Sequence, residues 1–316
     1  MDVSPVEREA EVPVTAPYDA PGIFRFLAAR AVAGVEAADL TRPEELRYAR
    51  TLTLPGGRAA VLVSATRNRS WNLRARLHLA SAADQGPALA VLRALFDADS
   101  DPVEADDLLA TDPALAPLVR ATPGIRIPGT VDPHELVVRA LVGQQISVAA
   151  ARTHLGRLAG ALGTPYCPPG PLQGHPPRDR PDEDSLFGSL HRHFPTAVQI
   201  ASGVPESVPG ERPDPERPLR LPGQGVRAVV GTCRALADGE LTVHAAAEPD
   251  ALRRELLARP RIGPWTAAYV AMRVLRDPDA WLDGDVALVA GAKAADLLDP
   301  DLAPRAAHRA LAVRAA

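Results

Sequence analysis

Cysteine, lysine and aromatic residues are all scarce in this chain of 316 residues, and the first two scarcities limit the metal sites and the nucleophiles that it can have. The two cysteines, Cys167 and Cys233, cannot supply a four-thiolate zinc or iron–sulfur site. Lys293 is the only lysine, so chemistry that needs a lysine nucleophile has a single candidate. Apolar runs stay well below the roughly 18 residues of a membrane span, and the acidic N-terminus lacks the apolar segment of a signal peptide. We therefore expect a cytoplasmic protein without a membrane partner.

The remaining composition is typical of a globular protein with two or three domains, with 46% apolar and 23% charged residues. The formal net charge of −4 argues only weakly against a nucleic-acid partner, because the charge of a whole chain says little about one face.

Residues 15–108 predict a small α+β domain. Residues 21–32 have helical spacing, with Phe26 and Arg30 near one face, and residues 88–101 return to a helical period. Between these helices, three segments alternate apolar and polar residues and predict an antiparallel sheet: 46–54, 58–66 and 72–80.

Residues 109–316 predict an all-α region, because strand signals disappear there. Asp132 is the expected N-cap of its first long helix, and Glu135 three residues later would complete a capping box. The helical pattern then continues on both sides of Gly143, which predicts two helices.

Three segments are expected to lie outside the folded regions. Residues 1–14, rich in proline and glutamate, predict a disordered tail. Two Pro-rich segments, at about 166–193 and 204–219, predict mobile surface insertions.

Near the end of the chain, a turn at Ile262-Gly263 separates two helical segments, and Pro264 can begin the second helix. A helix N-terminus binds anions, and a glycine beside it lets a phosphate approach the backbone. A plain corner between two helices is the alternative that these residues alone leave open.

On that second helix, Trp265, Tyr269 and Met272 share one face at i, i+4 and i+7. Such a stripe is more often core than pocket, but the helical region otherwise fills its core with Ala, Leu and Val. Rings beside a carboxylate favour a stacking site for a planar or cationic ligand. Asp285, in the next loop, is either a helix N-cap, a part that Asp283 can also play, or an anion that stabilises developing positive charge.

In this order and spacing, the segments resemble the helix-hairpin-helix DNA glycosylases, and most closely the DNA-3-methyladenine glycosylase II (AlkA-like) type. Residues 18–36 and the three strands resemble that family's N-terminal domain, and residues 125–151 the start of its helical core. Residues 221–241 and the hairpin follow in the family's order. The resemblance implies a mixed fold, with an N-terminal α+β domain that carries a small antiparallel sheet and an all-α helix-hairpin-helix glycosylase core.

Matched position by position, the resemblance implies that Asp285 is the catalytic aspartate and that Gln145 is the wedge that enters the duplex. The residues implied to line the base pocket are Trp265, Tyr269, Phe26 and Arg30. The residues implied to contact DNA are Arg261, Ile262, Gly263, Thr266, Gln144 and Gln145. No cofactor is implied apart from a monovalent cation on the main-chain carbonyls of Leu257, Arg259 and Ile262.

The implied activity is base-excision repair, in which an alkylated purine is flipped out of the duplex and its N-glycosidic bond is hydrolysed. An alkylated purine is already a good leaving group, so the reaction needs little general-acid catalysis and mainly one carboxylate near the sugar. The implied partner is double-stranded DNA carrying alkylated bases, bound by a monomer in the bacterial cytoplasm. Relatives that cut the strand use a lysine on the hairpin's second helix, which has none here, so a monofunctional enzyme is expected.

The sequence also departs from the family's pattern. Arg261 stands where the hairpin usually has its first glycine, which predicts a strained or differently wound turn. The chain ends just before the place of a Trp-rich final helix. A non-catalytic or inactive helix-hairpin-helix DNA-binding protein with a truncated C-terminus is therefore the alternative function.

Overall fold

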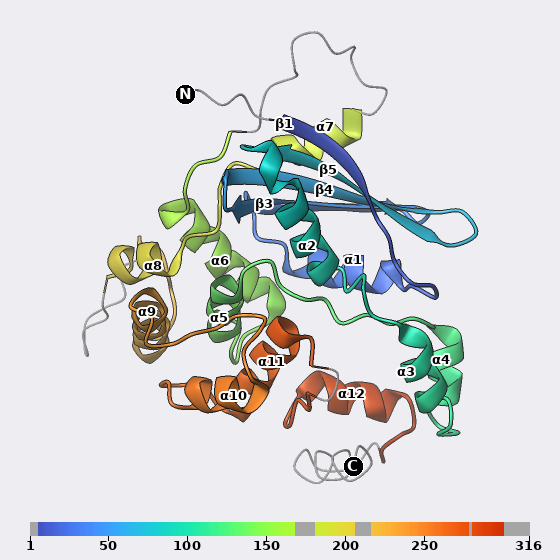
Figure 1. Ribbon diagram of the computed structural model, residues 1–316. Helices are drawn as coiled ribbons and strands as arrows, with labels where there is room; N and C mark the ends of the chain where they lie inside the picture. Colours follow the sequence, from blue (N-terminus) through green and yellow to red (C-terminus); the bar gives the residue numbers. More distant parts are fainter. Residues whose placement is uncertain (1–5, 168–180, 206–215, 278–279, 300–316) are drawn as a thin grey trace.

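A five-stranded antiparallel sheet in the order β1-β5-β4-β3-β2 forms the first half of the molecule (Figure 1). The computed structural model describes residues 6–167, 181–205, 216–277 and 280–299. The strands are β1 (Val6–Val12), β2 (Glu36–Arg42), β3 (Glu45–Leu54), β4 (Gly57–Arg67) and β5 (Trp71–Leu79). The three strands predicted from alternation correspond to β3, β4 and β5, and the predicted fold class is confirmed.

Strand β1 lies within the residues that the sequence predicts to be a disordered tail, so that prediction is wrong for Val6–Val12. The segment pairs with β5 along its whole length, from Val6 opposite Leu79 to Val12 opposite Leu73. Most of its side chains are exposed or half-buried, because it is an edge strand. Val6, Ala10 and Val12 share one face of this strand, but Arg8 interrupts that face and the three intervening glutamates give the segment the charged composition that predicts disorder.

Helices α1 (Ala20–Arg30) and α2 (Gln85–Leu95) cover one face of the sheet, and the first hydrophobic core lies between them and the strands. On the opposite face, α7 (Pro181–Gly188) contributes to a smaller cluster, in which Phe187 and Leu190 pack against Leu62. The first Pro-rich segment is therefore not a mobile insertion throughout, because its end is buried. Leu219, at the end of the second segment, is likewise buried. Residues 168–180 and 206–215 lie outside the described residues.

The second half of the molecule is helical, as predicted, and its core surrounds α5. In the described part of the chain its helices are α3 (Pro102–Leu109), α4 (Ala116–Ala121), α5 (Pro133–Val142), α6 (Val148–Leu162), α8 (Ala197–Gly203), α9 (Gly223–Ala237), α10 (Pro249–Leu257), α11 (Pro264–Leu275) and α12 (Val286–Ala294). Helices α5 and α6 lie on either side of Gly143, where the sequence places a break. Among the described helices, none has the length and apolarity to cross a membrane.

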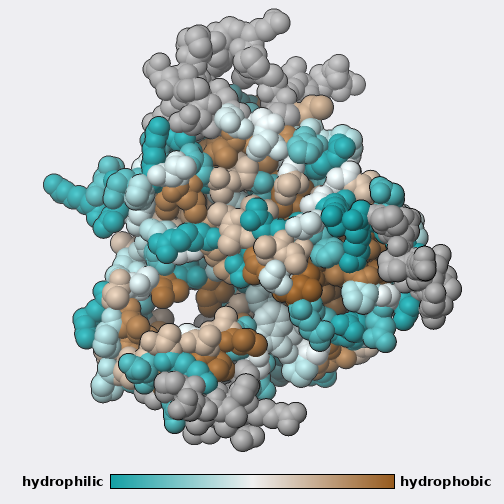
Figure 2. Space-filling model, turned by 180° about the vertical axis from the view of Figure 1, so that it is seen from behind, coloured by the Kyte–Doolittle hydropathy of each residue, from teal (hydrophilic) through white to brown (hydrophobic). Residues whose placement is uncertain are grey.

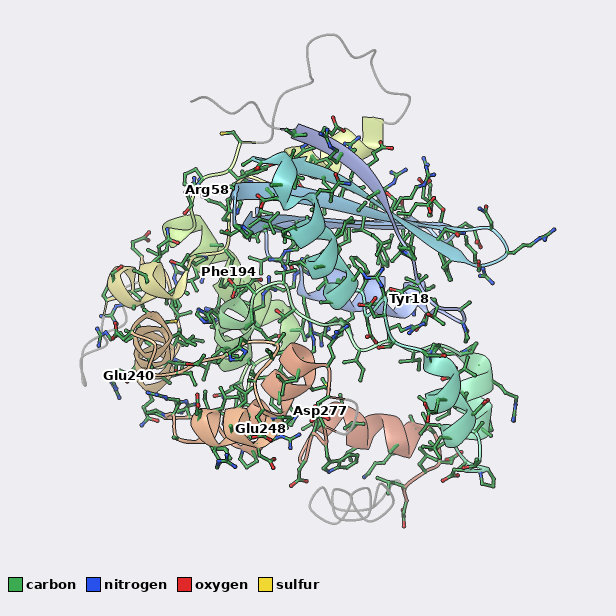
Figure 3. The ribbon with its side chains drawn as sticks, in the orientation of Figure 1. Tyr18, Arg58, Phe194, Glu240, Glu248 and Asp277 are labelled. Carbon is green, nitrogen blue, oxygen red and sulfur yellow. The ribbon has the colours of Figure 1, made fainter. Side chains whose placement is uncertain are left out.

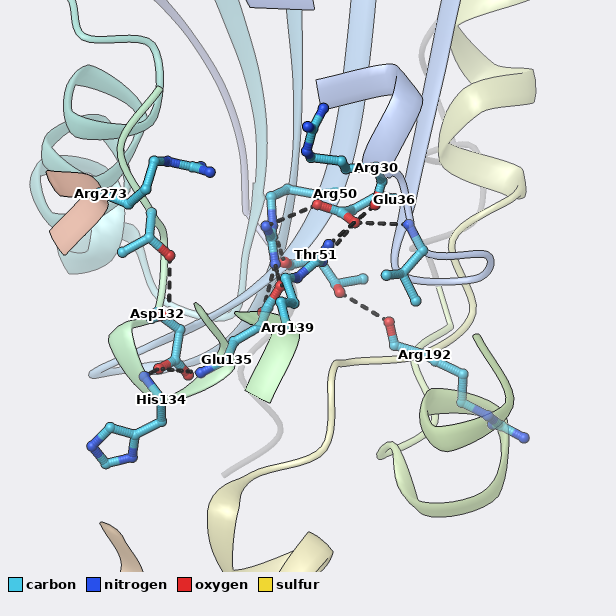
Figure 4. Close-up of polar contacts among 12 residues, drawn as sticks. Arg30, Glu36, Arg50, Thr51, Asp132, His134, Glu135, Arg139, Arg192 and Arg273 are labelled. Atoms are coloured by element: carbon cyan, nitrogen blue, oxygen red, sulfur yellow. Dashed lines mark hydrogen bonds and ion pairs between the residues drawn. The ribbon is translucent and has the colours of Figure 1, made fainter. Parts of the chain in front are cut away.

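A cluster of four charged side chains, three of them buried and Arg139 half-buried, joins the two halves (Figure 4). Glu36 and Arg50 come from the sheet, and Glu135 and Arg139 come from α5. The guanidinium of Arg50 lies 3.1 Å from the Glu36 carboxylate and 2.9 Å from that of Glu135. Arg139 lies 2.6 Å from both carboxylates. The hydroxyl of Tyr48 donates a further hydrogen bond of 2.6 Å to Glu36.

This cluster explains why the predicted capping box is only half formed. The Asp132 carboxylate accepts hydrogen bonds from the main-chain N–H groups of His134 and Glu135, as an N-cap should. The Glu135 side chain, however, points into the cluster and pairs with Arg50 and Arg139. A buried guanidinium holds this carboxylate more strongly than an exposed N–H at the helix start would.

The cluster also fixes the ionisation of Glu36. Burial alone would raise the pKa of this carboxyl, but the guanidinium groups of Arg139 and Arg50 outweigh burial and lower its pKa from 4.5 to about 2. A carboxyl whose pKa is lower in the folded than in the unfolded state stabilises the fold when it is ionised in both. This contribution is complete above about pH 4.5 and is lost as the pH falls towards 2.

We predict that Glu36→Gln lowers the free energy of unfolding at pH 7 by about 3 kcal/mol, because it leaves two guanidinium groups with Glu135 as their one remaining carboxylate in the cluster. Urea denaturation measures the change. The difference from the parent protein should shrink as the pH falls from 4.5 towards 2. The matched control is Glu11→Gln, since Glu11 and its partner Arg74 are 75% and 73% exposed, and an exposed pair contributes about 0.5 kcal/mol. Equal losses for the two variants would contradict the role given to the cluster.

Candidate active site

Helices α10 and α11 form the predicted hairpin, with Gly263 as the N-cap of α11 and Pro264 as its first residue (Figure 1). Arg261 has a φ of 64°, in the left-handed region. This conformation costs a residue with a side chain about 1–2 kcal/mol relative to glycine. The turn is therefore strained at the position where the sequence predicts strain.

Polar contacts from both sides hold the hairpin in place. Arg253 of α10 pairs with Asp277, just after α11, at 2.7 Å, and Arg259 donates a hydrogen bond of 2.8 Å to the carbonyl of Glu240 (Figure 3). The carbonyl of Arg259 accepts the N–H of Ile262 at 3.2 Å, which leaves one of its two lone pairs for another partner. The cation predicted on the carbonyls of Leu257, Arg259 and Ile262 stays a prediction.

Nothing inside the protein requires a glycine at position 263. Its φ of −91° is open to any residue, and a Cβ atom there would meet no atom of a neighbouring part of the described chain within 4 Å. Ser, Thr, Asp and Asn are the more favourable N-caps, since their side chains satisfy a free N–H of the first turn. A glycine at this point instead offers no side-chain oxygen to the N–H groups at the start of α11.

The four residues predicted to form a base pocket line one cavity of about 350 Å³. Trp265 and Tyr269 of α11 stack in parallel, with ring centroids 5.2 Å apart and an interplanar angle of 6°. Phe26 and Arg30 enter from α1, with the guanidinium carbon of Arg30 3.8 Å from the centroid of the Phe26 ring. Figure 2 shows the molecule hollowed beside α12. The cavity thus lies between the sheet domain and the hairpin.

Asp285 faces the same cavity, and both of its carboxylate oxygens accept hydrogen bonds. Oδ2 accepts the indole N–H of Trp265 at 2.9 Å, and Oδ1 accepts the main-chain N–H of Leu288 at 2.9 Å. Asp285, rather than the exposed Asp283, is therefore the N-cap of α12. The same carboxylate is held beside the ring stack in a fixed orientation.

Arg273 is a buried cation in the cavity wall that the sequence argument did not identify. Its guanidinium donates hydrogen bonds to the carbonyls of Pro128 and Gly129 and, at 2.7 Å, to the hydroxyl of Tyr269. All these acceptors are neutral oxygens, and burial lowers the pKa of the guanidinium. The signal was available, because Arg273 follows Tyr269 by four residues and so shares its helix face.

The residues predicted to contact DNA divide into two groups. Gln145 is exposed, in the loop between α5 and α6, and has a φ of 61°. Thr266 and Ile262, by contrast, are buried, so their side chains support the turn and do not form its outer surface. Gln144 is half-buried, and its amide donates hydrogen bonds to the Arg261 carbonyl at 2.8 Å and to the Thr266 hydroxyl at 2.9 Å.

A sheet domain joined to a helical hairpin, with a ring-lined cavity and one anchored carboxylate between them, is the arrangement of a helix-hairpin-helix glycosylase. Comparison with known proteins agrees. Residues 9–132 match the AlkA N-terminal domain family, and this matched range extends past the domain boundary predicted at residue 108. The fold is similar to that of a 3-methyladenine DNA-glycosylase from Archaeoglobus fulgidus, with a TM-score of 0.70, 15% identity, and coverage of 96% of this chain and 90% of the other.

Two relatives extend the similarity to the sequence. The chain is 30% identical over 272 residues to DNA-3-methyladenine glycosylase 2 of Escherichia coli, covering 85% of this chain and 82% of the relative. It is 37% identical over 282 residues to a probable bifunctional transcriptional activator/DNA repair enzyme AlkA of Mycobacterium tuberculosis. That match covers 89% of this chain but only 50% of the relative, so the chain spans about half of that protein's length. The chain belongs to the AlkA-like 3-methyladenine DNA glycosylase family.

We predict that Arg261→Gly raises the free energy of unfolding by about 1 kcal/mol, because glycine adopts the left-handed conformation without strain. Chemical denaturation measures the effect. The control is Arg254→Gly, at an exposed position inside α10, where glycine should instead destabilise by about 1 kcal/mol. A loss of stability at both positions would show that the turn is not strained at Arg261.

Proposed function

We propose that the chain is a monofunctional DNA glycosylase, which flips alkylated purines out of double-stranded DNA and hydrolyses the N-glycosidic bond. The observation that carries this proposal is the anchored carboxylate of Asp285 beside the parallel rings of Trp265 and Tyr269. The names of the two relatives, a DNA-3-methyladenine glycosylase and a DNA repair enzyme, support the same substrate class.

The rings give the extruded base a place to stack. A flat, electron-poor alkylated purine stacks well on an electron-rich ring face, and the cavity presents Trp265 and Tyr269 on one side and Phe26 on another. The walls also carry the cations Arg30 and Arg273. Binding a cationic base therefore depends on stacking and on Asp285, since the walls do not form a negatively charged trap.

Asp285 supplies the electrostatic part of catalysis in this proposal. As the glycosidic bond breaks, positive charge moves from the base to the sugar, and a fixed anion near the sugar lowers the energy of that state. The hydrogen bonds from Trp265 and Leu288 hold the carboxylate in one orientation before DNA arrives. Little reorganisation is then needed when the charge develops.

The positions of the cations argue against one route to strand cutting. A Schiff base at this site would need a lysine on α11, and α11 contains none. Lys293 lies in the last turn of α12, at the opposite end of that helix from Asp285. We therefore propose that the product is an intact strand with an abasic site.

We predict that Asp285→Asn slows base release by about 100-fold or more, equivalent to about 3 kcal/mol of transition-state stabilisation. Asparagine caps α12 about as well as aspartate, so the fold should persist, and loss of a negative charge should not weaken DNA binding. The measurement is single-turnover release of methylated purines from duplex DNA, with a separate binding titration. The control is Asp283→Asn, an exposed carboxylate two residues away, whose rate should stay within about twofold of the parent.

Equal rate losses at the two positions, or normal release by Asp285→Asn, would contradict the assignment. The same assay tests the rest of the proposal. A covalent protein–DNA adduct trapped by borohydride would rule out the monofunctional reaction. DNA binding by the parent protein without any base release would favour the alternative, a non-catalytic DNA-binding protein.

We also propose that the start of α11 binds a DNA phosphate, and we predict that Gly263→Asp weakens duplex binding about tenfold or more. Aspartate is a favourable N-cap, so the free energy of unfolding should hold or rise, whereas its charge would repel the phosphate. Titration at several salt concentrations should show parental affinity falling with salt and a shallower dependence for the variant. Gly86→Asp, which adds the same charge to the first turn of α2 on the sheet domain, is the control and should bind like the parent. Unchanged binding by Gly263→Asp would remove the hairpin from the DNA interface.

A further inference from the structure

A single side-chain amide connects the loop between α5 and α6 with the turn of the hairpin. Nε2 of Gln144 lies 2.8 Å from the carbonyl oxygen of Arg261 and 2.9 Å from the hydroxyl oxygen of Thr266. These partners are 117 and 122 residues away in the chain. The two bonds therefore fix one loop against another and do not stabilise a local turn.

Both loops are strained next to this amide. Gln145 follows Gln144 directly and has a φ of 61°, and Arg261 has a φ of 64°. Left-handed residues with side chains persist only where their surroundings enforce the conformation. The bond from Gln144 to the carbonyl of Arg261 acts at the strained residue itself. Its second bond reaches Thr266, which follows Trp265 in the first turn of α11.

The position of the Gln144 side chain is explained by its bonds within the chain, without a direct contact between its amino group and DNA. An amide NH₂ group has two hydrogens, and the two bonds to Arg261 and Thr266 use both of them within the chain. The neighbouring Gln145 is the exposed residue of the pair. Any effect of Gln144 on DNA is then exerted through the two loops that it connects.

We propose that Gln144 is a positioning residue that sets the spacing between the wedge at Gln145 and the phosphate-binding start of α11. The inference rests on the proposed function. A wedge that fills the gap left by a flipped nucleotide and a helix end that holds a nearby phosphate act together only when their spacing matches the DNA. Because Gln144 fixes this spacing before binding, the two loops lose less conformational freedom when DNA binds, and binding costs less free energy.

A purely structural amide offers a matched comparison elsewhere in the chain. Gln199 of α8 donates a hydrogen bond of 3.1 Å from its Nε2 to the hydroxyl of Thr164. Replacing either glutamine by methionine keeps the length of the side chain and removes its donors. Gln199→Met should lower stability without changing DNA binding, whereas Gln144→Met should change DNA binding beyond any change in stability.

The experiment measures the affinity of the full chain for two duplexes of the same sequence, one intact and one carrying a tetrahydrofuran abasic site. For Gln144→Met, we expect about tenfold weaker binding to the abasic duplex and less than a twofold change for the intact duplex. Gln144→Leu, which removes both N–H donors without adding a charge, should behave in the same way, and it replaces the methionine variant if that variant does not fold. Urea denaturation of each variant reports stability separately.

A double-mutant cycle with Gln145→Ala provides the decisive readout, because residues that act through one geometry are not additive. In the Gln144→Met background, Gln145→Ala should weaken abasic binding much less than it does in the parent. Additive effects, or equal losses on the two duplexes, would overturn the positioning role. If the parent itself binds the abasic duplex no more tightly than the intact one, the proposed function fails instead.

Discussion

The position of the cavity depends on the buried cluster of two carboxylates and two guanidinium groups between the sheet and α5. The cavity takes its walls from both halves of the molecule, and the two main cores do not merge around it. Arg139 also donates a hydrogen bond of 3.1 Å to the carbonyl of Arg30, the last residue of α1. The cluster therefore fixes the end of the helix that carries Phe26 and Arg30 relative to the helical core. An apolar contact could bury as much surface, but it would not specify this orientation.

The cavity wall contains the ion-pair cluster, whose charges cancel, and also Arg273 and Asp285, whose charges are separated. Glu36 and Glu135 balance Arg50 and Arg139, so the cluster adds no net charge. Arg273, in contrast, is buried among neutral acceptors and keeps its positive charge unbalanced. Asp285 lies at the other end of the ring stack, where it accepts the indole N–H of Trp265. In the proposed reaction, a cation near Tyr269 and an anion near Trp265 favour moving positive charge away from the base and towards the sugar.

Local signals made a large part of this arrangement predictable from the sequence. The N-cap at Asp132, the Gly-Pro start of α11 and the spacing of Trp265 and Tyr269 each depend on residues a few positions apart. The features that the sequence did not predict depend on distant partners. Strand β1 is defined by its ladder with β5, and the burial of Phe187 depends on the far face of the sheet. Glu135 satisfies the local capping pattern, but it pairs with Arg50, 85 residues away.

The hydrogen bond between Trp265 and Asp285 also joins two parts of the molecule that differ in how firmly they are held. Helix α11 belongs to the large helical core, whereas α12 buries Val289 and Ala292 in a small cluster of its own. Among the described residues, the rings and the carboxylate thus have separate supports. The position of the proposed catalytic carboxylate therefore depends on the packing of α12 as well as on that of α11.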